Sequence, residues 1–333
     1  MIFTKETHKI IFKDKYIIKG CAIQNADRQM YLLVEDDDEK IKSGILPEYR
    51  FVYTYAHIED PKERYFATGR THLSFPKIAY SQFDKDIIGL DVEGQFYSEG
   101  MDGDREEESL SIKFEGTVLT RLYTNLKAVG ESLYALGEPR TLFKRIGVND
   151  WQELSESIPL TGAYLAGLEN DEEFGWRDVD GFSEQDMYLA GLQGDVWHYD
   201  GSEFKQCDFP SNEWLANVCC ASDGFVYIGG RMGRLWKGKG DTWELISEAE
   251  FGVFWNDIVS FDNRLFLGSD YGLWELKDNE IVTAEVPSEV ILCSGELSVC
   301  PEKKLLLTAG NHGASMYDGK EWKILFNDFD LPD

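Results

Sequence analysis

The sequence has no long hydrophobic run and comparatively little positive charge. No stretch approaches the roughly 18 to 20 apolar residues that a membrane span needs, so we expect no transmembrane helix. The opening residues, MIFTKETHKIIFKDKY, carry scattered charges and no apolar core, which argues against a signal peptide. Lys and Arg number 33 against 61 Asp and Glu, for a net charge of −28. That charge opposes binding to nucleic acid and to anionic membranes, and it favours encounter with a basic partner.

Cysteine is scarce and lacks the spacing of a metal site. The six cysteines form no C-x-x-C pair, which argues against zinc. We interpret all six as reduced thiols, mostly in the core of a cytosolic protein: Cys21, Cys207, Cys219, Cys220, Cys293 and Cys300. Adjacent Cys219 and Cys220 would point to opposite faces of a strand.

Catalytic motifs are missing as well. The five histidines show no ligand spacing, and there is no G-x-S-x-G elbow, P-loop or dinucleotide fingerprint. We therefore expect no metal, no cofactor and no enzymatic activity. One alternative remains open, a carbohydrate-active hydrolase or lyase in which Asp178 and Asp257 act as acid and base across a channel.

The C-terminal half does contain a clear internal repeat. Each copy has a short apolar run, a Gly, a polar pair, a second Gly, an aromatic and a D-G-like turn. The copies are MYLAGLQGDVWHYDGSEFK from Met187, VYIGGRMGRLWKGKGDTWE from Val226, LFLGSDYGLWELKDNEIV from Leu265 and LLTAGNHGASMYDGKEWK from Leu306. The anchor glycines Gly191, Gly230, Gly268 and Gly310 are 39, 38 and 42 residues apart. Weaker copies occur near Gly137, near Gly89 and near residue 30.

Units of roughly 40 residues with four short strands are typical of propeller blades. We predict an all-β chain, a single β-propeller domain over residues 1–333, with clear repeats at 119–326 and degenerate blades at 1–118. Seven four-stranded antiparallel blades fit the length best if residues 98–109 and 157–174 are inserts, and six blades is the alternative. We expect the acidic runs 35–39 and 102–108 to be solvated loops, since neither has the full spacing of a calcium loop.

The repeats resemble the broad propeller family typified by photosystem II assembly factors and sialidase-like Asp-box propellers. The residues that carry the resemblance are Gly230, Gly233, Trp236, Gly240 and Trp243, then Gly310, Gly313, Asp318, Gly319 and Trp322. The resemblance implies the fold and little about function, because propellers host many unrelated activities. The turns YDGSEF and YDGKEW also lack the Ser of a full Asp box.

A polar residue recurs 11 to 14 residues before each anchor glycine: Asn125, Asp178, Asn217, Asp257 and Glu296. Aromatics precede several of them, at Tyr123, Trp176, Trp214 and Trp255. In a propeller these positions open on the same face as the Gly-x-x-Gly turns, which supply Arg231, Asp270, Tyr271, Asn311 and His312. Each position also has a structural interpretation, in which the polar group fixes a turn and the Trp wedges between blades.

Taken together, these residues predict an acidic, aromatic face that grips a basic protein. Residues 169–186 contain eight acids and one Arg. We expect Glu172, Glu173, Asp178 and Asp257 to pair with partner Lys and Arg, while Phe174, Trp176, Trp214 and Trp255 form the apolar centre. Asn217, Arg231, Asp270, Tyr271, Glu296 and His312 complete the predicted surface.

In size, charge and lack of catalytic motifs, the chain also resembles the immunity proteins of bacterial polymorphic toxin systems. That resemblance implies a cytoplasmic bacterial protein, a monomer when free, that occludes the active cleft of a basic toxin domain. The alternative is a scaffold or assembly factor that binds a partner without inhibiting it.

Overall fold

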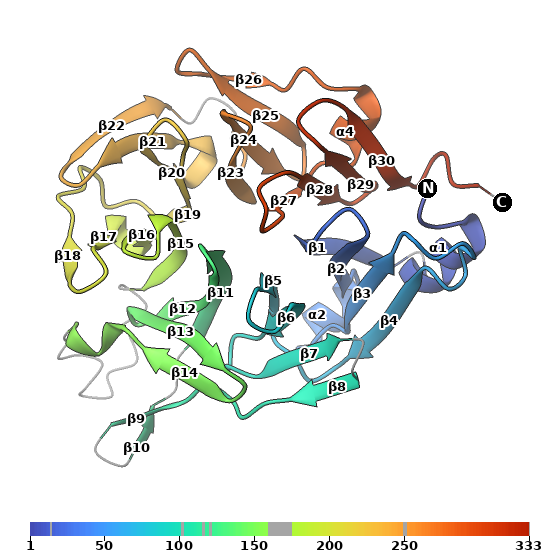
Figure 1. Cartoon of the computed structure of the whole chain (residues 1–333), viewed down its shortest axis with the longest axis horizontal. Coiled ribbons are helices and arrows are strands. Elements are labelled where there is room, and N and C mark those ends of the chain that lie inside the picture. The colour runs from blue at the N-terminus through green and yellow to red at the C-terminus, as the bar shows by residue number, and fades with distance from the viewer. Residues whose placement is uncertain are drawn as a thin grey trace.

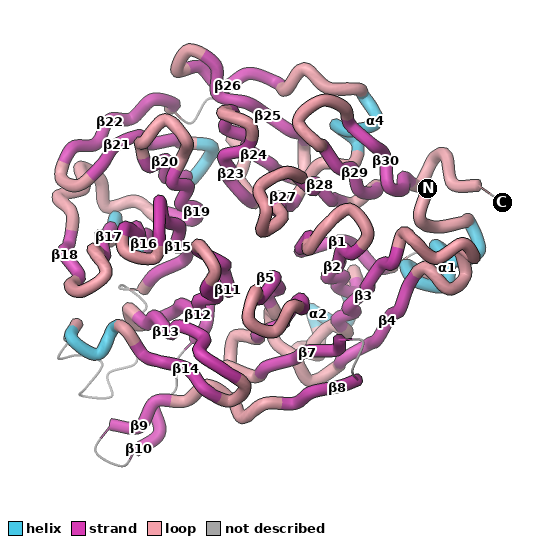
Figure 2. Tube along the Cα trace, viewed as in Figure 1, coloured by secondary structure: helices cyan, strands magenta, loops and turns pink. Residues whose placement is uncertain are grey.

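The chain folds into a ring of seven four-stranded antiparallel sheets, shown by a computed structural model that describes residues 1–13, 15–100, 103–114, 117–119, 122–158, 175–248 and 252–332 (Figure 1). Within each sheet the strands follow one another in chain order. The prediction of a seven-bladed propeller is confirmed, and the six-bladed alternative is wrong. Figure 2 shows that helical segments are short and lie in the connections.

The blades run around the ring in sequence order. Blades 1 to 3 comprise β1 Tyr16–Ile23, β2 Arg28–Glu35, β3 Tyr49–Tyr55 and β4 Tyr65–Arg70; β5 Lys77–Ser81, β6 Asp86–Leu90, β7 Phe96–Gly100 and β8 Gly103–Glu106; and β11 Leu122–Val129, β12 Ser132–Glu138, β13 Thr141–Gly147 and β14 Asp150–Glu153. Blades 4 and 5 comprise β15 Trp176–Ser183, β16 Asp186–Gly191, β17 Val196–Tyr199 and β18 Phe204–Gln206; and β19 Leu215–Cys220, β20 Val226–Gly230, β21 Leu235–Lys239 and β22 Thr242–Ser247. Blades 6 and 7 comprise β23 Asp257–Phe261, β24 Arg264–Ser269, β25 Gly272–Lys277 and β26 Glu280–Thr283; and β27 Glu296–Val299, β28 Leu306–Gly310, β29 Gly313–Tyr317 and β30 Trp322–Asn327.

The remaining elements lie before β1 or between these strands. They are α1 Lys5–Phe12, α2 Asp38–Lys42, α4 Ser288–Leu292, the single turns η1 Ser155–Ser157, η2 Leu192–Gly194 and η3 Arg231–Gly233, and the hairpin of β9 Ile112–Phe114 with β10 Thr117–Leu119.

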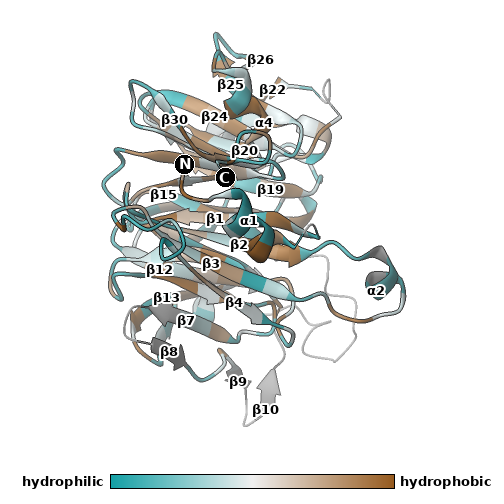
Figure 3. Ribbon diagram, turned by 90° about the vertical axis from the view of Figure 1, so that its right-hand side faces the viewer, coloured by the Kyte–Doolittle hydropathy of each residue, from teal (hydrophilic) through white to brown (hydrophobic). Residues whose placement is uncertain are grey.

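The two ends of the ring differ in which connections they carry. The first strand of every blade is innermost, and successive strands run in opposite directions. The loops that enter first strands therefore share one end of the ring with the turns between second and third strands. We call this end the entry face; among the described residues it includes 71–76, 207–214, 231–234, 252–256, 270–271, 284–295 and 311–312. Helix α2 projects from it in Figure 3.

Glycine is required at two of the anchor positions, Gly191 and Gly310, because the entering loop crosses the end of the second strand at close range. A Cβ built on Gly191 would lie 1.8 Å from the Gly175 carbonyl oxygen, and one on Gly310 would lie 1.9 Å from that of Ser294. No side chain tolerates such an approach to rigid backbone. In blade 6 the register places Ser269, rather than the predicted anchor Gly268, at the equivalent position.

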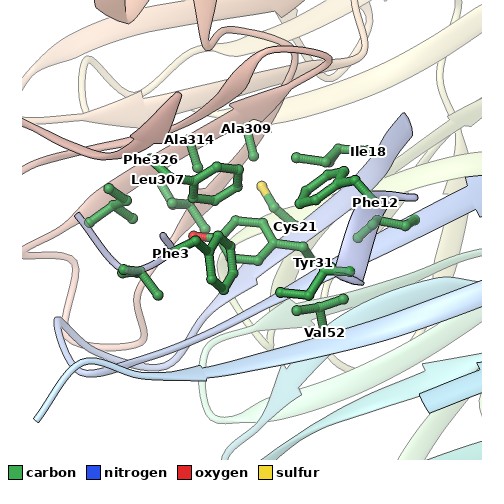
Figure 4. Close-up of a cluster of buried hydrophobic side chains, with 14 of the residues drawn as sticks. Phe3, Phe12, Ile18, Cys21, Tyr31, Val52, Leu307, Ala309, Ala314 and Phe326 are labelled. Atoms are coloured by element: carbon green, nitrogen blue, oxygen red, sulfur yellow. The ribbon is translucent and has the colours of Figure 1, made fainter. Parts of the chain in front are cut away.

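The ring closes by packing rather than by a strand shared between the first and last blades. The Ile2 backbone N–H donates to the Leu325 carbonyl at 2.7 Å, and that of Lys5 donates to Pro332 at 2.8 Å. A buried cluster then joins the N-terminal segment, blade 1 and blade 7 (Figure 4), with Phe3 against Phe326 at 4.8 Å between ring centroids.

Alternation along single strands places residues in different cores, as the cysteine pair illustrates. Cys219 packs into the cluster between blades 5 and 6, whereas Cys220 lies against the cluster between blades 4 and 5. All six cysteines are free and five are buried, in agreement with the expectation of core thiols.

The two acidic runs are not simply solvated loops, and this expectation is corrected. Glu35 is buried at the end of β2 and pairs with Lys15 and Lys40. Burial opposes its ionisation, but those hydrogen bonds outweigh burial and lower its pKa to about 2. In the second run, 103–106 forms the outer strand β8, and Glu107 bonds the buried Arg145 at 2.6 Å. Part of the predicted insert 98–109 is therefore regular blade, and most of the other, 157–174, lies outside the described residues.

Candidate functional site

A cavity of about 930 Å³ occupies the centre of the ring and is lined by all seven innermost strands. Each strand contributes at least one polar or thiol side chain, namely Lys19, Lys77, Lys127, Asp180, Cys219, Asp257 and Glu296. The volume lies within the range of ordinary ligand pockets. It makes the channel the natural candidate site.

The recurring polar residues hold equivalent positions in five blades. Each pairs across the sheet with the residue just before the close-approach position, at Leu136, Ala190, Gly229, Gly268 and Ala309. In β11, β15 and β19 a bulge immediately precedes the polar residue. A bulge re-aims the side chain that follows it. Asn125, Asn217, Asp257 and Glu296 line the channel, whereas Asp178 is buried and is not part of the lining.

Their hydrogen bonds join one blade to the next. The Val218 N–H donates to Asp178 Oδ2 at 2.8 Å, and the Leu297 N–H donates to Asp257 Oδ2 at 2.9 Å. Asn217 Nδ2 in turn donates to the Asn256 carbonyl at 3.0 Å. The structural interpretation of these positions therefore holds, because each polar group fixes the inner edge of a blade interface.

Asp178 is also neutralised. Its side chain is buried, Lys127 Nζ donates to Oδ2 at 2.9 Å, and Asn125 Nδ2 donates to Oδ1 at 2.9 Å. Burial alone would lower the pKa of Lys127, but the carboxylates of Asp178, Asp257 and Asp180 raise it well above its usual value. This ion pair leaves Asp178 committed to the fold. The proposed acid and base role of Asp178 would require breaking it.

Asp257 and Glu296 face the same cavity without such compensation. Among the described residues, their side chains accept hydrogen bonds from the Leu297 N–H and from Asn256 Nδ2, the latter at 3.2 Å. Burial, and then the Asp257 charge, raise the pKa of Glu296 to about 7. Burial likewise raises the pKa of Asp257, although Lys127 and Lys77 act in the opposite direction. The nearby cations Lys19, Lys77 and Lys127 therefore do not offset the effect of burial on the pKa of these two carboxyl groups.

The predicted aromatic anchors divide into two kinds. Trp176 and Trp255 are buried in the cores between blades, at 0% and 3% exposure, so a partner docking on this arrangement cannot reach them. Trp214 lies at the cavity mouth and is 39% exposed. The guanidinium carbons of Arg177 and Arg231 lie 5.2 and 4.9 Å from its ring centroid. Such contacts stabilise both groups.

Three further predicted residues lie on entry-face turns. Tyr271 is 80% exposed, and its neighbour Asp270 accepts hydrogen bonds from Lys19 at 3.0 Å and Asn256 at 2.7 Å. His312 is exposed and lies 3.5 Å from Asp328. Glu172, Glu173 and Phe174 lie outside the described residues. The mouth that the structure does describe mixes acids with Lys19, Lys77 and Arg177, so it is less uniformly acidic than the sequence predicts.

Sequence reasoning missed two residues at the mouth, Phe75 and Leu122. Both line the cavity and are exposed, and Phe75 has a left-handed backbone with φ of 47°. The blade 1 and 2 repeats are too degenerate to align, which hid Phe75. A usable signal was the Phe-Pro pair directly before the alternating run KIAYS.

The described part of the chain offers neither a metal-binding cluster nor a membrane-spanning helix. No cluster of three or more His, Cys, Asp and Glu residues in the described part of the chain could hold a metal ion. No helix among the described residues is both long and apolar enough to cross a bilayer.

Comparison with known proteins connects the fold to a named relative. The chain is 27% identical over 234 residues to Immune protein Tsi7 of Pseudomonas aeruginosa, covering 70% of this chain and 73% of that protein. This finding confirms the resemblance to immunity proteins. No known protein-family profile matches the chain.

Solved propellers share the architecture. The WD40 propeller domain of Doa1 superimposes with a TM-score of 0.56 at 11% identity, covering 90% of each chain. YCF48 bound to a D1 peptide gives a TM-score of 0.50 at 12% identity, covering 78% of this chain and 81% of that one. At these identities the similarity shows the fold alone.

Proposed function

We propose that this propeller is an immunity protein that binds a bacterial toxin domain through its entry face and blocks the toxin's active cleft. The similarity to Immune protein Tsi7 carries the proposal, because it extends over most of both chains. Together with the propeller fold, it supports a protein-binding role rather than a catalytic one.

The distribution of exposed apolar side chains supports the entry face as the contact surface. More of the exposed large hydrophobic residues lie at this end than at the other: Ile45, Leu46, Phe75, Leu122, Trp214, Met232, Phe254, Tyr271, Leu292 and Phe329. Phe83, Ile146, Val148 and Phe225 are exposed at the opposite end. Exposed apolar residues gathered on one side of a protein mark interaction sites, and Trp and Tyr dominate binding energy there. This surface would bury the aromatic centre of the complex.

Charge would supply the encounter. A net charge of −28 attracts a basic domain over distances comparable to the Debye length. On the entry face, Asp270 adjoins the exposed Tyr271, and Glu296 lines the cavity whose mouth holds Trp214. These two acids replace Asp178 as the groups that we propose to pair with partner Lys and Arg, and Glu172 and Glu173 remain predicted members.

The test expresses a candidate toxin domain, sought first among the neighbouring genes, and measures its affinity for this protein by calorimetry at about 0.15 M salt. Trp214→Ala and Tyr271→Ala should each weaken binding at least tenfold, since truncation of a central aromatic costs about 2 kcal/mol or more. Phe225→Ala is the matched control, because Phe225 is exposed in the β19–β20 turn on the opposite face.

The outcomes separate the alternatives. Losses confined to Trp214 and Tyr271 support the entry face. Equal affinity for all three variants would place the contact elsewhere. Tight binding that leaves the toxin fully active would favour a scaffold over an inhibitor.

A further inference from the structure

The rim of the central cavity is chemically divided. On one side, Phe75 before β5, Leu122 at the start of β11 and Trp214 before β19 line the cavity and are 70%, 43% and 39% exposed. On the other side, β23 and β27 supply Asp257 and Glu296. The apolar side therefore comes from blades 2, 3 and 5, and the acidic side from blades 6 and 7.

The apolar side has the character of a binding site rather than of incidental exposure. Three large side chains from separate blades converge on one cavity. Phe75 adopts φ of 47°, a conformation that bulky residues rarely take and that costs on the order of 1–3 kcal/mol. Its N–H is held by the Tyr49 hydroxyl at 3.2 Å. The fold thus keeps an aromatic ring exposed at the mouth in spite of strain.

The acidic side lacks a matched cation. Lys77 on β5 and Lys19 on β1 act on the Glu296 carboxyl, while Asp257 on β23 and Asp270 in the β24–β25 turn oppose them. Lys19 is itself engaged by Asp270 at 3.0 Å. Asp178, by contrast, has Lys127 at 2.9 Å. A further positive charge near Asp257 and Glu296 would be stabilised by both carboxylates in a partly desolvated site.

We propose that the cavity receives a protruding segment of the partner in which a large apolar residue adjoins a Lys or Arg. The apolar side chain contacts Phe75, Leu122 and Trp214, and the cation reaches Asp257 and Glu296. The proposal rests on the proposed function and adds to it how the partner is recognised, by insertion into the ring rather than by flat occlusion. A cavity of about 930 Å³ has room for a few side chains.

The first test uses short capped peptides and needs no toxin. The probe is acetyl-Gly-Phe-Arg-Gly-amide, and the matched peptides replace Arg by Glu or Phe by Gly. Binding is followed by NMR titration and by the change in total tryptophan fluorescence, to which all nine tryptophans contribute. The Phe-Arg peptide should bind at least about tenfold more tightly than either matched peptide. Equal binding of the Phe-Glu peptide would overturn the proposal.

Two variants locate the site. Glu296→Gln keeps the shape and the acceptor of the Asn256 hydrogen bond, and should weaken Phe-Arg binding about tenfold. Its control is Glu302→Gln, since Glu302 is exposed, pairs with Lys304 and lies outside the cavity lining. Phe75→Ala should weaken binding similarly, whereas Phe225→Ala should not. A thermal melt of each variant confirms that it is folded.

The toxin domain then distinguishes this inference from the proposed function. If Glu296→Gln and Phe75→Ala both weaken the complex, insertion is supported. If they leave it unchanged while Tyr271→Ala weakens it, the proposed function stands without Glu296 as a pairing group, and insertion is wrong. If the wild-type protein does not bind the toxin, the proposed function itself fails.

Discussion

Asp178 and Asp257 hold the same place in blades 4 and 6, yet their surroundings give them different roles. Both accept a hydrogen bond from the next blade's backbone, at 2.8 and 2.9 Å. Asp178 also pairs with Lys127, whereas Asp257 faces Glu296, and the pKa of both acids is raised by burial. A repeat therefore supplies equivalent positions, and the neighbouring blade decides whether a carboxylate stabilises the ring or stays available to a ligand.

The difference also changes how the site should be tested. Replacing Asp178 with Lys would place two ammonium groups together in a buried position, and we expect that variant to unfold. The exposed aromatics and Glu296 are the appropriate targets for binding experiments.

The largest effect on stability should come from removing Lys127, the cation that pairs with Asp178. Lys127→Met leaves Asp178 as an uncompensated buried charge and should cost about 3–5 kcal/mol of unfolding free energy. Lys77→Met removes a cation that acts on Asp257 and Glu296. It should cost less than about 1 kcal/mol of unfolding free energy, because Lys77 is exposed. Urea denaturation of both variants measures the two losses of unfolding free energy. Equal losses would mean that Asp178 does not depend on its cation more than Asp257 and Glu296 do.

The second prediction compares two tryptophans that precede first strands, the buried Trp255 and the exposed Trp214. Trp255→Ala should destabilise the protein by about 3–5 kcal/mol, because it empties a core between blades. Trp214→Ala should cost less than about 1 kcal/mol in stability and act mainly on affinity. Thermal melts combined with calorimetry separate the two. A large loss of stability in Trp214→Ala would assign this residue to the core as well.

The smallest effect concerns pH. The folded-state pKa of Glu296, about 7, lies above its usual value of 4.5, so its contribution to stability is lost as pH rises between those values. Glu296→Gln has no charge to bury. It should melt a few degrees above the wild type at pH 8.5 and nearly with it at about pH 4, below the usual pKa of a Glu. Glu302→Gln should show no such change, and a difference independent of pH would contradict the assignment.

Particular residues show how far sequence reasoning reached. The spacing of Gly191, Gly230 and Gly310 identified blades. Close backbone approach admits only glycine at Gly191 and Gly310, whereas a Cβ on Gly230 would meet the Glu213 side chain. The recurring polar positions were also found from spacing, and they do lie at equivalent places. The burial of a side chain could not be predicted from spacing. Trp176, Trp214 and Trp255 share a sequence context but differ in exposure.

Sequence alone determined the all-β repeat architecture and the acidic balance of the chain, because strand period, turn chemistry and charge are local properties. It favoured seven blades over six, and the closed ring decided between them. Tertiary structure decided which of the equivalent residues stabilise the blade interfaces and which stay available to a partner. Whether Asp178 meets Lys127, whether a Trp is covered, and whether Phe75 reaches the cavity depend on contacts across blade interfaces and around the closed ring. Burial and electrostatic pairing are set by those contacts, which residues distant in the chain provide.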